Sequence, residues 1–339
     1  MKMDLNKIFT SNMVFPRRKP IRIYGSGKGK VEILFGGCKK TLTSDSENWM
    51  VEFPPMEYGG PHIMEVIFED KTVTLTNIYI GEVFLFAGQS NMEFKMKETN
   101  YPKEKYASNS KIRIFSTDRI EKGKDKFSSD DGWVVCNENN VADLSALAYL
   151  TSINLAQNTN IAIGVIVCYQ GASVIESWVP CGAFKKIDID IAPEGKFIDH
   201  RNEKYSAWNK DGTLYSFALS QVMPFSLSAV IWYQGESDTS EEEGKVYLDE
   251  LCTLIKIWRK DFSNENLPFA VVQIADCKSR LTNGWLLVQK AQKDVEEKLS
   301  NVKTVISKDV CETDEIHPKT KDKLAKRIYM VLKQLCDLE

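Results

Sequence analysis

One apolar stretch of the sequence constrains the fold more than any other. Residues 83–87 form a run of five apolar side chains, which indicates a strand buried on both faces, as in the centre of a parallel sheet. Gly88 ends this run, and the small polar residues Ser90 and Asn91 follow where the chain must turn. Open α/β sheets bind their ligands at the carboxyl ends of strands. The stretch therefore predicts either a nucleophilic serine on a sharp turn or an ordinary loop in which Ser90 caps the next helix.

The pattern of apolar runs divides the chain into two parts. Residues 1–78 contain short runs separated by glycine, proline and charged turns, which is typical of a small β-sandwich. From 79 to 339, strand-like runs alternate with amphipathic segments, which indicates a parallel sheet covered by helices on both faces. In this second part we expect strands at 83–87, 112–115, 161–169, 229–233, 269–274 and 302–306, and helices at 143–157, 243–261, 285–299 and 320–335. Residues 180–212 are an irregular, charged insert, expected either to shape the site or to mediate contacts in a homo-oligomer.

Composition and charge exclude several classes of protein. The net charge of −3 does not favour binding to nucleic acid. Residues 1–15 lack the apolar core of a signal peptide, and the longest apolar run, 161–169, is too short to span a bilayer. The eight cysteines include no CxxC pair, which argues against a zinc site or a disulfide framework and favours a reducing compartment. We therefore expect a cytoplasmic protein that does not enter a membrane.

The residues for a nucleophilic reaction can be chosen by elimination. A serine hydrolase needs a base within reach of its nucleophile and an acid that orients the base. Of the three histidines, His62 lies in the β-rich part and His200 in the irregular insert, which leaves His317. Asp314 stands three residues before it, a spacing that lets the carboxylate accept a bond from the imidazole Nδ1–H while Nε2 faces Ser90. Taken alone, this pair could also be a solvated acidic loop with an incidental histidine.

Other strand ends supply donors for an oxyanion. The backbone N–H groups of Ser90 and Gly171 are natural donors, and a glycine lets a substrate approach the backbone closely. The side-chain amide of Gln234 could supply a third donor. Glu236 could orient His317, hold the Gln234 amide in place, or be a surface carboxylate.

Four further residues are weaker candidates. Gln89 and Asn91 flank the serine and are expected to support the site. Trp178 either walls the site or belongs to the core. Arg280, in the loop after the strand at 269–274, either contacts an anionic substrate or is a solvated loop charge.

Four motifs in this order resemble SGNH-type hydrolases of the sialate O-acetylesterase group. They are Gly-Gln-Ser-Asn-Met at 88–92, Gln-Gly-Ala-Ser at 170–173, Gln-Gly-Glu-Ser at 234–237 and Ile-His-Pro at 316–318, with Asp314 at the position of the family's acid. The resemblance covers nearly the whole chain. It departs from the family at Ala172-Ser173, where Gly-Thr is usual, and in lacking a large β insertion that some relatives contain. The resemblance implies a flavodoxin-like α/β/α fold of three layers, preceded by a small N-terminal β-sandwich.

The motifs and the resemblance together predict a serine esterase. Ser90 would attack an acetyl ester of a sugar, most simply an O-acetylated sialic acid, with His317 as base and Asp314 as orienting acid. No metal or organic cofactor is expected. The alternatives are an esterase for acetylated xylan oligomers, a lipid or thioester hydrolase on the same scaffold, and a carbohydrate-binding protein that has kept the scaffold without catalysis.

Overall fold

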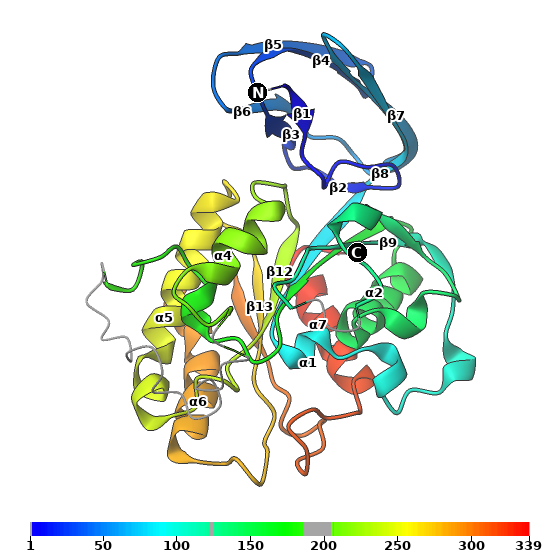
Figure 1. The fold of residues 1–339 in the computed structure, drawn as a ribbon. Coiled ribbons are helices and arrows are strands. Elements are labelled where there is room, and N and C mark those ends of the chain that lie inside the picture. Colours follow the sequence, from blue (N-terminus) through cyan, green and yellow to red (C-terminus); the bar gives the residue numbers. More distant parts are fainter. Residues whose placement is uncertain (1, 122–124, 186–204, 206, 339) are drawn as a thin grey trace.

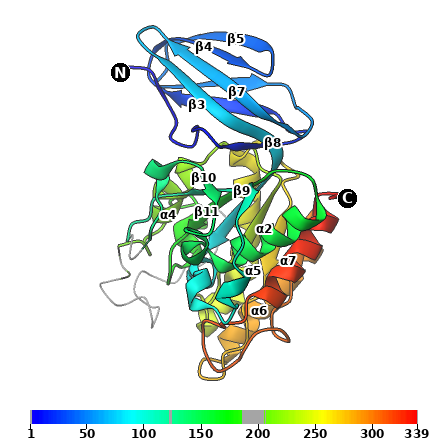
Figure 2. The same ribbon diagram turned by 90° about the vertical axis from the view of Figure 1, so that its right-hand side faces the viewer.

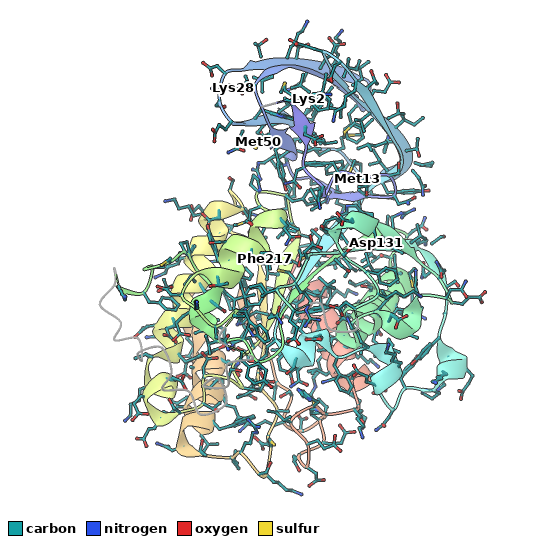
Figure 3. The ribbon with its side chains drawn as sticks, in the orientation of Figure 1. Lys2, Met13, Lys28, Met50, Asp131 and Phe217 are labelled. Carbon is teal, nitrogen blue, oxygen red and sulfur yellow. The ribbon has the colours of Figure 1, made fainter. Side chains whose placement is uncertain are left out.

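The computed structural model describes residues 2–121, 125–185, 205 and 207–338. A β-rich N-terminal part sits on one end of a larger α/β part, so the fold is mixed α/β, as the sequence predicts (Figures 1 and 2). No helix in the described residues has the length and apolarity that a bilayer span requires. Side chains fill the space between the layers (Figure 3).

The N-terminal part consists of two antiparallel groups of strands. The first contains β1 (Asp4–Leu5), β3 (Ile21–Ser26) and β6 (Asn48–Phe53). The second contains β4 (Gly29–Phe35), β5 (Cys38–Ser44), β7 (Gly59–Phe68) and the first half of β8 (Thr72–Gly88), and β2 (Val14–Pro16) pairs with β8 in parallel. Alternate residues of β4 and β6 are buried. The rings of Phe35 and Phe53 meet edge to face 6.1 Å apart, so the alternating side chains of the two groups form a common core.

Strand β8 runs through both parts of the molecule. Its first half pairs with β7, and its second half pairs in parallel with β11 (Ile163–Tyr169) and β12 (Ala229–Tyr233). Burial along β8 alternates up to Ile80 and is continuous from Gly81 to Gly88. The same strand therefore changes from a half-exposed to a fully buried environment. Among the short strand-like runs of residues 1–78, the run at 72–78 was expected to be a strand separate from the one at 83–87. The structure joins the two in one strand.

The central sheet has the order β10-β9-β11-β8-β12-β13-β14. Its strands pair in parallel from β9 to β14, and β10 is antiparallel at the edge. The remaining strands are β9 (Asn109–Ser116), β10 (Val134–Cys136), β13 (Phe269–Val272) and β14 (Val302–Val305). Helices α2 (Ala146–Asn158) and α7 (Asp322–Leu335) lie on one side, and α5 (Glu241–Asp261) and α6 (Asn283–Lys298) on the other (Figure 1). These helices and strands match the predicted ones to within a few residues, whereas the three-residue strand β10 was not predicted.

Short helices complete the fold. These are α1 (Ser90–Glu93), α4 (Thr213–Phe217) and the 3-10 turns at Met96–Glu98, Lys103–Lys105, Ser129–Asp131, Val141–Asp143, Ile175–Trp178 and Leu219–Gln221. The N-cap of α1 is Gln89, and Ser90 is its first helical residue. The interpretation of Ser90 as a helix cap is therefore wrong. The predicted insert at 180–212 lies largely outside the described residues, and so does His200.

Buried polar and aromatic contacts join the N-terminal part to the rest. The ring of Phe15 stacks on Phe225 at 5.4 Å, and the hydroxyl of Tyr24 donates to the Val222 carbonyl at 3.1 Å. Met13, at the junction in Figure 3, is fully buried. Since β8 also crosses this junction, the N-terminal part is packed firmly against the end of the central sheet opposite its carboxyl edge.

Candidate active site

Three parallel strands end at the same level and bring three loops together. In the sheet register, Gly88 at the end of β8 lies between Tyr169 of β11 and Tyr233 of β12. The loops that follow begin with Gln89, Gln170 and Gln234. The sequence therefore correctly placed these motifs at one edge of the sheet, where ligands of open α/β sheets bind.

Ser90 and His317 meet at this edge. The imidazole Nε2 lies 2.8 Å from Ser90 Oγ, within hydrogen-bonding distance. His317 comes from the long loop between β14 and α7, 227 residues away in the chain. The imidazole is half-buried, and Phe94 lies beside it, with ring centroids 6.1 Å apart. This arrangement can remove a proton from the serine hydroxyl.

The environment of the imidazole favours its neutral form. Burial lowers the pKa of His317 most, and the nearby charges of Lys321 and Arg280 lower the pKa further. The carboxylates of Glu98 and Glu315 act in the opposite direction but do not compensate. A neutral imidazole is the form that accepts a proton.

Two backbone N–H groups are available beside Ser90. A Cβ built on Gly171 would lie 3.7 Å from Ser90 Cβ and 3.1 Å from Glu93 Oε2, which places the Gly171 loop against Ser90. Within the described residues, neither the Ser90 N–H nor the Gly171 N–H donates to another group. Both donors can therefore turn toward an oxyanion.

Gln234 does not have the predicted orientation. Its side chain is fully buried, and its Nε2 donates to the Ser173 carbonyl at 2.8 Å and to the Asp238 carboxylate. Its Oε1 accepts from the hydroxyl of Tyr247 at 2.8 Å. The amide is thus occupied in holding the chain that follows Gly171, and it does not line the cavity next to Ser90. The prediction of a third oxyanion donor at Gln234 disagrees with the structure.

Asp314 also differs from its prediction. Its side chain is 76% exposed, and its carboxylate accepts from Lys278 Nζ at 2.8 Å. It makes no hydrogen bond to His317, because the loop turns its side chain outward to solvent. The three-residue spacing brings the backbone close to the imidazole but does not fix the direction of the side chain.

This placement predicts a small effect for Asp314→Asn. Because the carboxylate is exposed and does not contact the imidazole, we expect kcat to fall less than about fivefold, as for an exposed ion pair. An acid that held the imidazole tautomer would cost about 10⁴-fold. Steady-state rates with an acetyl ester distinguish the two cases, and Lys278→Met, which removes the same ion pair, is the matched control. A loss above a hundredfold in Asp314→Asn alone would restore Asp314 as the orienting acid.

Glu236, Asn91 and Gln89 support the site from beneath. Glu236 is buried, its Oε1 accepts from Asn91 Nδ2 at 2.6 Å, and its Oε2 has no partner in the described residues. Burial raises the pKa of Glu236. Gln89 Oε1 accepts from the Gly235 N–H at 3.1 Å, and its Nε2 donates to Ser237 Oγ at 3.3 Å. Glu236 therefore forms no hydrogen bond to His317 or to the Gln234 amide among the described residues, and instead holds Asn91, the residue that follows Ser90.

A cavity of about 450 Å³ opens over Ser90 and His317. Its lining is polar and mixed in charge: Gln89, Ser90, Glu93, Arg119, Glu121, Gln170, Gly171, Ala172, Tyr205, Trp208, Glu236, Ser237, Arg280, Ile316 and His317. Arg280, an exposed residue, is part of this lining. Trp178 is not, because it is fully buried, packs against Trp232 and Trp258, and bonds through Nε1 to Ser173 Oγ. It is therefore a core residue.

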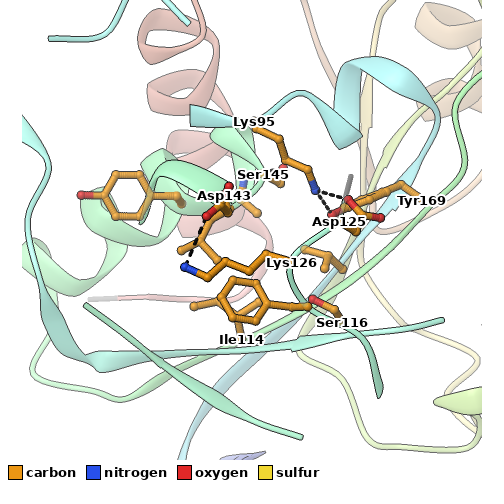
Figure 4. A pocket seen from close by; sticks show the side chains of 13 residues that line it. Lys95, Ile114, Ser116, Asp125, Lys126, Asp143, Ser145 and Tyr169 are labelled. Atoms are coloured by element: carbon orange, nitrogen blue, oxygen red, sulfur yellow. Dashed lines mark hydrogen bonds and ion pairs between the residues drawn. The ribbon is translucent and has the colours of Figure 1, made fainter. Parts of the chain in front are cut away.

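One charged network near Ser90 was not predicted. Arg119 donates through Nη1 and Nη2 to the two carboxylate oxygens of Glu93, at 2.8 and 3.0 Å, and also to Asp125. Lys95 Nζ donates to Asp125 Oδ1 at 2.8 Å and to the Tyr169 hydroxyl at 2.6 Å, in the small neighbouring cavity of Figure 4. These charges compensate one another, so the network braces Glu93 against the Gly171 loop. No local sequence spacing links Glu93 to Arg119, 26 residues later.

The described residues include no group of three or more His, Cys, Asp or Glu side chains arranged to bind a metal ion. All eight cysteines are free thiols.

Comparisons with known proteins find similar sequences and a similar solved structure. Residues 198–330 match the sequence model of a family described as carbohydrate esterase, sialic acid-specific acetylesterase. The human sialate O-acetylesterase is 24% identical over 325 residues, covering 86% of this chain and 61% of the human protein, and the mouse enzyme is 24% identical over 348 residues. The chain thus spans about three fifths of the length of these relatives.

The fold is also shared with a solved structure. A carbohydrate acetylesterase from Xanthomonas citri superposes with a TM-score of 0.85 at 21% identity, covering 99% of this chain and 76% of that one. At this identity the likeness shows the fold. Together with the sequence matches, it confirms the resemblance to the sialate O-acetylesterases that the four motifs indicated.

Proposed function

We propose that this relative of the sialate O-acetylesterases is a serine esterase that removes O-acetyl groups from a sugar, with an O-acetylated sialic acid as its substrate. The contact between Ser90 Oγ and His317 Nε2 at 2.8 Å, at the base of an open polar cavity, carries the proposal. The names of the human and mouse relatives and of the Xanthomonas citri structure support the substrate class.

The proposed reaction has two halves. Ser90 Oγ attacks the acetyl carbonyl while His317 Nε2 takes its proton, and the N–H groups of Ser90 and Gly171 stabilise the tetrahedral oxyanion. The C–O bond to the sugar then breaks, and His317 returns the proton to the sugar oxygen. In the second half His317 takes a proton from water, the hydroxide attacks the acetyl-enzyme, and Ser90 recovers its proton as acetate leaves.

The cavity suits an ester of a polar alcohol, such as a sugar, better than an ester of a lipid. Its lining contains five charged side chains besides His317, and its edge is open. We propose that Arg280 contacts the carboxylate of the acetylated sugar, because it is a lining cation on a loop above the nucleophile. Arg119 is already held by Glu93 and Asp125 and is a structural cation.

The proposal extends to the architecture. Residues 79–339 would form a flavodoxin-like catalytic domain of the SGNH type, and residues 1–78 a β-sandwich domain. The parallel pairing of β9, β11, β8, β12, β13 and β14 supports the first assignment. The two antiparallel groups of strands at the N-terminus support the second. Because β8 crosses residue 79, the two domains would share a strand.

Acetate release from a panel of substrates tests the proposal. We expect 9-O-acetyl sialic acid to be cleaved at least tenfold faster than an acetylated xylo-oligosaccharide or a neutral acetylated hexose, measured as kcat/KM. If the neutral acetylated sugars were cleaved as fast as 9-O-acetyl sialic acid, the protein would still be an esterase, but sialic acid would not be its preferred substrate. Absence of any acetate release, together with no mass increase on Ser90 from a serine-directed phosphonate, would identify a non-catalytic binder.

A further inference from the structure

A buried amide links the nucleophile to the base. Asn91 follows Ser90 directly and is 1% exposed. Its Nδ2 donates to the carbonyl of Ile316 at 2.9 Å, and Ile316 directly precedes His317. Its Oδ1 accepts from Lys321 Nζ at 2.7 Å. Through one side chain, therefore, the turn that carries Ser90 is bonded to the loop that carries His317.

Lys321 occupies an unfavourable position for a lysine. It is 1% exposed, and it is the N-cap of α7, where the helix dipole disfavours a positive charge. Its Nζ donates only to Asn91 among the described residues, and it lies 5.0 Å from the centroid of the Phe94 ring, beside the imidazole. A buried charge in such a place costs stability, and the proposed catalysis gives it a role.

We infer that Lys321 is a positioning residue for the proposed serine esterase: through Asn91 it fixes the His317 loop against Ser90, and it places a positive charge beside the imidazole. The inference rests on the proposed function. It also assigns to Lys321 and Asn91 the alignment of the base that Asp314, turned to solvent, does not supply.

The charges around His317 determine whether replacing Lys321 raises or lowers the pKa of the imidazole. Lys321 at the start of α7 and Arg280 after β13 oppose a proton on the imidazole, whereas Glu98 and Glu315 favour it. Lys321 itself is surrounded by Glu236, Glu312, Glu98 and Cys311, and burial lowers its pKa to about 8, so it is mainly charged at pH 7. Removing that charge removes the repulsion that an imidazolium would feel. The pKa of His317 should therefore rise.

The test compares Lys321→Met with Lys323→Met, which removes an exposed lysine two residues along the chain. In the wild type, kcat/KM for 4-nitrophenyl acetate should fall with acid only below the ordinary histidine pKa of about 6.5. In Lys321→Met we expect this acid limb of the pH profile to move up by on the order of one pH unit. We expect kcat to be at least about tenfold lower, because the Asn91 amide that holds the His317 loop loses its bond to Lys321. Lys321→Arg should keep the wild-type limb, and Lys323→Met should match the wild type throughout.

A second measurement does not depend on activity. The pKa of His317, followed by NMR with ¹³C-labelled histidine and assigned with His317→Gln, should rise in Lys321→Met and not in Lys323→Met. An unmoved pKa and an unmoved acid limb would overturn the inference, even if kcat fell. If Lys321→Met does not fold, Glu236→Gln/Lys321→Met removes both buried ionisable partners of Asn91 and should show the same rise.

The two measurements separate the inference from the proposed function. A wild type without esterase activity, in which the pKa of His317 still depends on Lys321, would overturn the function alone. If the wild type were active but the pKa of His317 were the same in Lys321→Met, the inference alone would be overturned.

Discussion

Ser90→Ala should lose about 10⁴- to 10⁶-fold in kcat on acetylated sugars. The methyl group of alanine cannot form the acetyl-enzyme, and His317 is left without the hydroxyl that lies 2.8 Å from its Nε2. Because Ser90 is half-buried in a cavity lined mainly by other residues, KM should change by only a few-fold. Acetate release under single-turnover and steady-state conditions measures both quantities.

A second serine in the same cavity provides the control. Ser237 lines the cavity and accepts from Gln89 Nε2 at 3.3 Å. Ser237→Ala should retain activity to within about fivefold, because its hydrogen bond from Gln89 is long and its hydroxyl has no part in the proposed reaction. A phosphonate should label the wild type and Ser237→Ala on Ser90, and should not label Ser90→Ala. Full activity in Ser90→Ala, or a label on Ser237, would show that the nucleophile has been misassigned.

The fold was predictable where the pattern of burial is simple. The apolar run at 83–87 gave the central strand because a strand between two parallel neighbours, with helices on both faces, buries every side chain. The amphipathic segment at 320–335 correctly predicted α7, because Leu324, Ile328 and Leu332 recur every four residues and so lie on one buried face of a helix. The junction was not predictable. No local pattern shows that the run at 72–78 continues into 83–87 as one strand.

The site was predictable to the level of the backbone. Parallel strands end at one edge, so the loops after residues 88, 169 and 233 had to meet, and a single histidine was left to serve Ser90. The directions of side chains in those loops depend on long-range hydrogen bonds that spacing does not reveal. Gln234 turns into the core toward Ser173, and Asp314 turns to solvent toward Lys278.

The burial of Lys321 was the feature of the site that the sequence predicted least. It belongs to a lysine-rich stretch, with Lys319 and Lys323 on either side, and this pattern predicts an exposed side chain. The structure exposes Lys323 and buries Lys321 under the nucleophile turn, bonded to Asn91. The usable signal was the register of the predicted helix at 320–335, in which Lys321 stands three residues before Leu324 and seven before Ile328, on the face that is buried.

Gly88→Ala should destabilise the protein by about 3 kcal/mol or more and abolish activity, because it affects the turn from which Ser90 projects. Gly88 has φ +144°, and a Cβ there would lie 2.0 Å from the carbonyl oxygen of Tyr233 and 2.6 Å from its carbonyl carbon. Both are backbone atoms of the neighbouring strand, so no side-chain rotation can relieve the clash. Moving β12 away would break its pairing with β8 at the sheet centre and shift Ser90 from His317.

Gly37→Ala is the control for the steric clash at Gly88, because it places an alanine at a positive φ without a neighbouring atom to collide with. Gly37 also has a positive φ, +76°, but nothing lies within 4 Å of a Cβ built on it. Gly37→Ala should therefore cost only about 1 to 2 kcal/mol, the usual penalty of a left-handed residue, and leave kcat unchanged. Urea unfolding of both variants measures the free energies of unfolding. If Gly88→Ala proved no less stable than Gly37→Ala, the close approach of β8 and β12 at Gly88 would be wrong, and with it the sharp turn that presents Ser90.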